Sequence, residues 1–150
     1  MPARIELFGV DIDALQMDEA VAQIQAWIAD DRGRCQFVVT PNVDHIVLLQ
    51  KSVELRSAYR DAGMVLADGA PVLWSSRWLR PAGRVMPERV AGSDLAPAIF
   101  ASARAERPLR TYLLGAAPGV ADRAADNIER RWPSVEVVDT YSPPLGFERN

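Results

Sequence analysis

Short apolar runs alternate with helix-forming stretches along this chain, and the alternation strongly limits the folds that it can adopt. The apolar runs, which we expect to form strands, cover residues 5–8, 36–40, 63–67, 111–114 and 135–138. Helices are expected at residues 17–31, 45–50, 53–61, 72–79, 93–107 and 120–132. Such alternation is typical of an α/β fold, so we expect a Rossmann-like, mainly parallel sheet with helices on both faces. The length of 150 residues suits a single domain over residues 1–150.

The composition excludes several classes of protein. Hydrophobic residues make up 49% of the chain and charged residues 25%, which is ordinary for a globular protein. The formal net charge of −3 argues against a nucleic-acid-binding domain, because such domains are usually basic. No stretch approaches the roughly 18 uninterrupted apolar residues that span a membrane, and the charged first residues do not resemble a signal peptide. We therefore expect a cytoplasmic protein.

The single cysteine and the single histidine limit the chemistry open to the chain. Cys35 has no partner for an intramolecular disulfide, and its place before an apolar run predicts a buried, inert thiol. His45 is the only histidine, so a zinc site is not expected. Asp11 and Asp13 have the spacing of a D-x-D element, but their place at the edge of the first strand favours a turn. We expect neither a metal nor another cofactor.

Three loops that follow predicted strands carry polar or glycine residues. They are Thr40-Pro41-Asn42, Asp68-Gly69-Ala70-Pro71 and Gly115-Ala116-Ala117-Pro118-Gly119. In open α/β sheets, ligands bind beyond the carboxyl ends of the strands. If the strands are parallel, the three loops lie on one rim of the sheet, and we predict the functional site on that rim.

Asp68-Gly69 is the sharpest feature of this rim. A carboxylate that follows a buried strand can act as a general base, and glycine lets a ligand approach the backbone closely. Asp-Gly is also a common turn pair, whose carboxylate only accepts from local amides, so both interpretations stay open. Thr40 and Asn42 leave a similar choice between binding a substrate hydroxyl and capping the next helix.

Two further segments offer groups that bind phosphate. The Gly115 loop presents backbone amides at a helix N-terminus, but it lacks the glycine fingerprints of nucleotide-binding loops and is also compatible with a plain turn. Arg89 precedes the segment 90–94, and its guanidinium either brings a cation to a diphosphate or lies in solvent. Between these segments, residues 72–79 are expected to form a largely buried helix with two tryptophans, and residues 80–89 a loop.

Taken together, these segments resemble the WecG/TagA/CpsF glycosyltransferases, also called glycosyltransferase family 26. The resemblance rests on the order and spacing of motifs that cover nearly the whole chain. The motifs are Phe8-Gly9-Val10 with Asp13, Thr40-Pro41-Asn42-Val43-Asp44, Ala67-Asp68-Gly69-Ala70-Pro71-Val72, Arg89-Val90-Ala91-Gly92-Ser93-Asp94-Leu95 and Tyr112-Leu113-Leu114-Gly115-Ala116-Ala117-Pro118-Gly119-Val120. Within the family, the loop at residues 141–147 most resembles the β-glucosyltransferases of xanthan-type exopolysaccharide synthesis.

The resemblance implies a reaction and the residues that carry it. A sugar, glucose in the narrower match, moves with inversion from a UDP-sugar to a polyprenyl-diphosphate-linked sugar at the inner face of the cytoplasmic membrane, without a metal. By the same resemblance, Asp68 deprotonates the acceptor hydroxyl, and Thr40 and Asn42 lie near the donor, with Thr40 counted as catalytic. Arg89 lies near a diphosphate or the acceptor phosphate. The other residues expected to bind substrate are Gly69, Gly92, Asp94, Gly115, Ala116 and Tyr141.

The resemblance also bears on the extent of the chain and on its partners. Family catalytic domains continue with a further strand-rich segment and a basic C-terminal tail that docks at the membrane. We therefore expect the chain to be incomplete at its C-terminus, membrane contact to belong to the full-length parent, and an exposed apolar surface to favour a homo-oligomer. The main alternative is a non-catalytic nucleotide-binding or interaction module. A nicotinamide-dependent oxidoreductase is weaker, because the first strand-to-helix turn lacks the glycine fingerprint.

Overall fold

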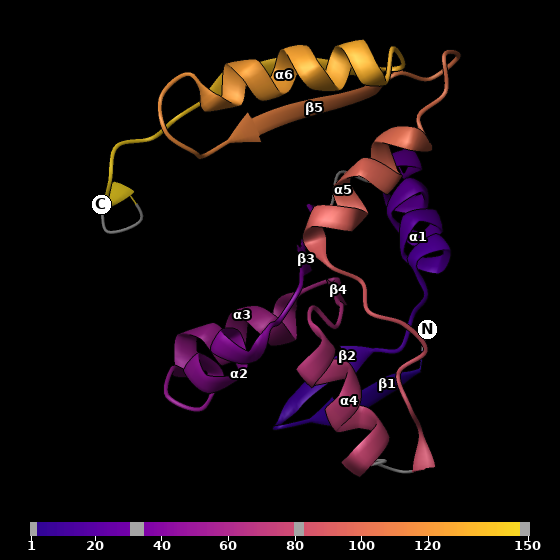
Figure 1. Ribbon diagram of the computed structural model, residues 1–150, viewed down its shortest axis with the longest axis vertical. Coiled ribbons are helices and arrows are strands. Elements are labelled where there is room, and N and C mark those ends of the chain that lie inside the picture. The colour runs from indigo at the N-terminus through magenta and orange to yellow at the C-terminus, as the bar shows by residue number, and fades with distance from the viewer. Residues whose placement is uncertain (1–2, 31–34, 80–82, 148–150) are drawn as a thin grey trace. The chain divides into compact units, whose positions relative to one another are not determined.

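The computed structural model describes residues 3–30, 35–79 and 83–147, and the chain divides into two compact units, Met1–Ala98 and Ile99–Asn150 (Figure 1). The first unit contains β1 (Arg4–Leu7), β2 (Val10–Asp13), α1 (Met17–Ala29), β3 (Val38–Val39), α2 (Val43–Leu49), α3 (Val53–Asp61), β4 (Met64–Val65) and α4 (Ala70–Leu79). α5 (Gly92–Ala101) begins in the first unit and ends in the second, which also contains β5 (Leu109–Leu114), α6 (Val120–Arg131) and β6 (Val135–Tyr141).

An antiparallel hairpin opens the first unit. β1 pairs with β2 in a register that sets Arg4 opposite Asp13. Phe8 and Gly9 form the tip, and both have positive φ, 56° and 74°. A two-residue turn with positive φ at both positions matches the right-handed twist of the two strands. The turn predicted at Asp11 to Asp13 is therefore wrong, because this segment is the second strand of the hairpin.

A parallel pair follows. Val38 in β3 lies opposite Met64 in β4, and α2 and α3 connect the two strands. A parallel pair needs such a crossover, because a short turn cannot return the chain to the same end. Each of the two helices begins at a side-chain cap, where Asn42 accepts from the His45 N–H and Ser52 from the Leu55 N–H.

The core of the first unit lies where the hairpin meets α2, α3 and α4. The inward residues of the hairpin alternate with exposed ones along β1, which is what period-2 side-chain geometry requires. The buried cluster consists of Ile5, Leu7, Val10, Ile12, Ile46, Leu49, Tyr59, Ala62, Val65, Ala67, Val72 and Met86. The helix α2 contributes to it through two residues three apart, Ile46 and Leu49.

The second unit is built from a parallel strand pair and the helix that connects its strands. β5 pairs with β6 from Leu109 opposite Val135 to Leu114 opposite Tyr141, with a register shift after Thr111. Figure 1 shows α6 lying along β5. The Glu129 carboxylate of α6 accepts from the Val137 N–H of β6 at 2.9 Å, which ties the helix to the strand.

Among the described residues, the strands form three two-stranded sheets, two of them parallel and one antiparallel. The predicted α/β class is confirmed, but the first strand pairs antiparallel and so departs from a uniformly parallel order. A Rossmann-like sheet with helices on both faces, and a single domain over the whole chain, stay predictions. No helix in the described ranges is long and apolar enough to cross a membrane.

Two further expectations are wrong, and a third is right only in part. Cys35 is exposed, since β3 begins only at Val38 and residues 35–37 before it lie at the surface. The helix predicted to reach residue 107 ends at Ala101, where the Ser102 hydroxyl donates to the Ile99 carbonyl and competes with the helical pattern. The helix expected at 72–79 forms as α4, but its two tryptophans are exposed. Residues 31, 80, 81 and 82, which the predictions also covered, lie outside the described residues.

Tyr59 makes the stability of the first unit sensitive to alkaline pH. Its side chain lies in the core, its hydroxyl is 2.7 Å from His45 Nδ1, and burial raises the pKa of the phenol above its usual 10.0. Above pH 10 the unfolded chain loses this proton while the folded chain keeps it. The stabilisation is therefore complete below pH 10 and is lost as the pH rises through the raised pKa.

We expect the free energy of unfolding to fall more steeply above pH 10 in the wild type than in Tyr59→Phe, measured by urea denaturation across a pH series. Tyr112→Phe, which removes an exposed phenol, is the control and should leave the wild-type slope unchanged. Equal slopes in the wild type and Tyr59→Phe would show that the phenol does not titrate as its burial requires.

Candidate functional site

The parallel pairing of β3 with β4 brings two of the predicted loops together. Hydrogen bonds between the strands continue past their ends, from the Leu66 N–H to the Val39 carbonyl at 2.9 Å and from the Asp68 N–H to the Pro41 carbonyl at 3.1 Å. The loop with Thr40 and the loop with Asp68 are therefore neighbours at the carboxyl edge of this pair. This confirms, for two of the three predicted loops, the shared position expected from the sequence.

Arg89 joins this edge from a segment about twenty residues further along the chain. The Val90 N–H donates to the Ala67 carbonyl at 2.9 Å, which lays the segment against the end of β4. The guanidinium of Arg89 then lies between two carboxylates, with Nη1 3.6 Å from Asp68 Oδ1 and Nη2 2.6 Å from Asp94 Oδ2. The Asp68 and Arg89 side chains are 30% and 43% exposed, so both can reach a ligand from solvent.

Glycine allows two close approaches at this edge. A Cβ on Gly92 would lie 3.3 Å from Thr40 Oγ1, so the start of α5 packs tightly beside the threonine hydroxyl. Gly69 has a φ of +100°, a conformation that other residues rarely adopt, and it turns the chain from Asp68 into α4. The predicted site residues Thr40, Asp68, Gly69, Arg89, Gly92 and Asp94 are thus brought together within the first unit.

Asn42 has a structural role in the same loop. Its Oδ1 accepts from the His45 N–H at 3.0 Å and caps α2, which is the second of the two roles that the sequence left open. The cap fixes the direction in which the chain leaves the Thr40 loop. Binding of a donor by Asn42 stays a prediction.

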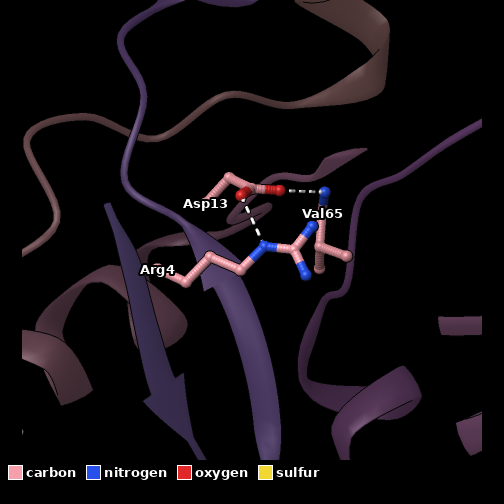
Figure 2. A network of polar contacts seen from close by, with 3 residues as sticks. All are labelled: Arg4, Asp13 and Val65. Atoms are coloured by element: carbon pink, nitrogen blue, oxygen red, sulfur yellow. Dashed lines mark hydrogen bonds and ion pairs between the residues drawn. The ribbon is translucent and has the colours of Figure 1, made fainter. Parts of the chain in front are cut away.

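Asp13 is a buried carboxylate that sequence reasoning treated only as part of a turn. Figure 2 shows it between Arg4 and Val65. One oxygen accepts from Arg4 Nε and the other from the Val65 N–H, each at 2.9 Å, and the side chain is 2% exposed. Because Val65 is in β4, three residues before Asp68, this network fixes the strand that presents the candidate base. It also leaves Asp13 unable to pair with Asp11 as a D-x-D metal site. The sequence did contain a signal for this network. It was a charged residue within an alternating apolar strand, with an arginine opposite it across a hairpin.

The remaining predicted residues form a second group, in the second unit. The Gly115 N–H donates to the Tyr141 carbonyl at 2.8 Å, and the Ser142 hydroxyl donates to the Gly115 carbonyl at 3.4 Å. Gly115 and Ala116 both have positive φ, at 119° and 65°, so the backbone reverses sharply before α6. Gly115, Ala116 and Tyr141 are therefore neighbours. Their position on one rim with Asp68 stays a prediction.

A model of the glycosyl transferase WecG/TagA/CpsF family matches residues 5–150 of this chain. The chain belongs to that family. The match includes every residue of both candidate groups, and it confirms the family inferred from the motifs.

The chain is also similar to curated proteins. The chain is 26% identical over 136 residues to N-acetylglucosaminyldiphosphoundecaprenol N-acetyl-beta-D-mannosaminyltransferase of Staphylococcus aureus, in strain NCTC 8325 / PS 47 and equally in strain COL. The match covers 89% of the chain and 51% of each relative, so the chain spans about half the length of the curated relatives it matches. The names of these relatives describe sugar transfer to a lipid-linked sugar diphosphate.

The first group combines two side chains of complementary chemistry. The carboxylate of Asp68 is a proton acceptor that solvent and ligand can reach. The guanidinium of Arg89 is a cation beside it, with a planar set of donors suited to phosphate oxygens. Asp94 holds that guanidinium in place through the 2.6 Å contact.

Proposed function

We propose that the chain carries the catalytic edge of an inverting glycosyltransferase, which moves a sugar from a UDP-sugar to a polyprenyl-diphosphate-linked sugar. The observation that carries this proposal is the Asp68–Arg89 pair at 3.6 Å, next to Thr40, at the carboxyl edge of β3 and β4. A base and a phosphate-binding cation stand side by side there, in a chain whose family consists of glycosyl transferases.

Each side chain has a defined part in the reaction. Asp68 accepts the proton of the acceptor hydroxyl while that oxygen attacks the anomeric carbon of the donor. The bond from the anomeric carbon to the diphosphate oxygen breaks on the opposite face, which inverts the configuration. UDP leaves with the electron pair of that bond, and Arg89 neutralises the negative charge that develops on its diphosphate. Thr40 donates to a donor or acceptor oxygen from the side of Gly92.

The donor sugar and the acceptor are the finer part of the proposal. The relatives' names support a lipid diphosphate acceptor that carries a sugar, and N-acetylmannosamine as the transferred group. The loop at residues 141–147 resembles enzymes that transfer glucose in exopolysaccharide synthesis. We infer a UDP-sugar in either case, with glucose as the first donor to test, and an address at the inner face of the plasma membrane, where such acceptors are found.

Arg89→Ala should lower kcat/KM on the order of 10²-fold, because the leaving diphosphate loses its cation. The kcat/KM of Arg89→Lys should lie between those of Arg89→Ala and the wild type, since a lysine restores the charge without the planar fork. Initial rates over a series of donor concentrations measure both effects. Arg110→Ala, which removes an exposed arginine of β5, is the control. A rate for Arg89→Ala equal to that of Arg110→Ala would remove Arg89 from the site.

Donor binding tests the proposal before any turnover is measured. Calorimetric titration of the chain, and of a C-terminally extended version, with UDP-glucose and UDP-N-acetylmannosamine should give saturable binding, with GDP-mannose much weaker. Binding without transfer by the extended version would favour the alternative, a non-catalytic nucleotide-binding module. If the extended version binds no UDP-sugar, the glycosyltransferase proposal fails.

A further inference from the structure

The exposed face of α4 is apolar, although a helix that is apolar on both sides is normally buried. Val72 and Ser76 on one side of α4 are buried in the first unit. On the other side Trp78 is 89% exposed and Trp74 57% exposed. The outward stripe has helical spacing i, i+3, i+4 and i+7 and consists of Pro71, Trp74, Ser75 and Trp78. Two exposed tryptophans in one stripe mark an interaction surface.

This stripe forms a groove with the tip of the β1–β2 hairpin. The groove has a volume of about 630 Å³ and is lined by Phe8 and by α4 residues between Pro71 and Leu79. Phe8 is 45% exposed and has a φ of 56°, a left-handed conformation that is costly for a bulky residue. An aromatic side chain held outward on a strained turn is consistent with a binding role.

A basic cleft lies on the other side of the same tip. It has a volume of about 170 Å³ and is lined by Gly9 of the tip, by Arg4, Arg56 and Arg60, and by the single carboxylate of Asp11 among others. Arg4 is already bound to Asp13. Arg56 and Arg60 are one turn apart on α3, and neither guanidinium forms a hydrogen bond or ion pair within the described part of the chain. The cleft therefore offers two guanidinium groups against the one carboxylate of Asp11, which is an excess of one positive charge.

We propose that the apolar groove and the basic cleft, which meet at Phe8-Gly9, together dock on the surface of an anionic lipid bilayer. Tryptophan and phenylalanine side chains favour the interfacial region of a membrane, and arginines beside them bind lipid phosphates. Charge decides between this occupant and a second copy of the chain. A symmetric dimer over this surface would bring the arginines of the two copies toward each other, whereas an anionic surface neutralises them.

The surface is placed to serve the candidate site. α4 begins at Ala70, immediately after Asp68-Gly69, and its ten residues rise about 15 Å along the axis. Docking through α4 thus holds the candidate base within about that distance of the lipid headgroups. This use of the surface rests on the proposed function, because it assumes a lipid-linked acceptor. Docking itself does not, and it can be measured without a nucleotide sugar.

Co-sedimentation with vesicles tests the docking surface. The chain should bind vesicles of phosphatidylglycerol and phosphatidylcholine, and should bind pure phosphatidylcholine less. Trp74→Ser/Trp78→Ser should bind these vesicles at least on the order of tenfold more weakly, because the interfacial side chains are gone. Arg56→Gln/Arg60→Gln should lose about tenfold or more on the anionic vesicles and should no longer prefer them. The four substituted residues are exposed or half-buried, so we expect both double variants to fold, and circular dichroism checks this.

Matched variants in the second unit control for the loss of exposed apolar or basic side chains. Tyr112→Ser/Leu114→Ser removes two exposed apolar residues of β5, and Arg123→Gln/Arg130→Gln removes two exposed arginines of α6. Both should bind vesicles like the wild type. The proposal is overturned if the wild type ignores anionic vesicles, if the Trp variant binds them equally well, or if the Trp variant loses only self-association in sedimentation equilibrium. Vesicle binding by a C-terminally extended protein that binds no UDP-sugar would contradict the proposed function alone.

Discussion

An Asp68→Asn variant is expected to fold normally and to transfer sugar about 10²–10⁴-fold more slowly than the wild type. Asparagine has the shape of aspartate but cannot take up the proton of the acceptor hydroxyl. The side chain is 30% exposed, and within the described residues it forms an ion pair with Arg89 at 3.6 Å, so folding should lose little. Initial rates at saturating donor and acceptor, measured on the C-terminally extended protein, give the ratio.

The decrease should appear in kcat while UDP-sugar affinity is retained, since Asp68 acts on the acceptor and not on the nucleotide. Asp126→Asn, which changes an exposed carboxylate of α6, is the matched control and should transfer sugar at the wild-type rate. A natively folded Asp68→Asn protein as fast as Asp126→Asn would show that another group accepts the proton.

Asp13→Ala is expected to lower the free energy of unfolding by about 2–3 kcal/mol. The substitution removes the acceptor of the buried Val65 N–H and of Arg4 Nε, both at 2.9 Å. The Val65 amide is left without its partner in the core, which is the larger part of the loss. Arg4 is 44% exposed and can return to water, so its share is small. Urea denaturation of the 150-residue chain measures the difference.

Two other variants separate the terms of this network. Arg4→Ala should cost no more than about 1 kcal/mol, because it removes only the half-exposed partner. Asp11 lies on the same strand as Asp13 and is exposed. Asp11→Ala should therefore change the free energy of unfolding by less than about 0.5 kcal/mol. An Asp13→Ala protein as stable as Asp11→Ala would mean that the buried carboxylate does not hold β4.

The sequence predicted the local elements where one face of the element had to be apolar. α3 begins and ends at the predicted residues, and β5 and β6 form at the predicted places with longer bounds. The same reasoning failed for α4, because an apolar pattern does not say whether its second face meets a core or solvent. It failed for Asp13 because the partners that make a buried carboxylate favourable, Arg4 across the hairpin and Val65 in β4, are set by tertiary structure.

The candidate site shows the same division between local and long-range information. Thr40 and Asp68 could be paired from the sequence, because parallel strands place their following loops at one edge. The contact of Arg89 with Asp68 depends on the hydrogen bond from Val90 to Ala67, which no local pattern encodes. The capping role of Asn42 was one of two open alternatives, and the 3.0 Å bond to the His45 N–H decides that it caps α2.

Product analysis of a transfer reaction tests the central claim most directly. The C-terminally extended protein, incubated with a UDP-sugar and a polyprenyl-diphosphate-linked sugar, should release UDP and add one sugar to the lipid, as mass spectrometry of the product would show. Nuclear magnetic resonance should find the new glycosidic bond inverted relative to the donor, and Asp68→Asn should form far less product in the same time while still binding UDP-sugar. A product with retained configuration, or equal product from Asp68→Asn, would contradict the account.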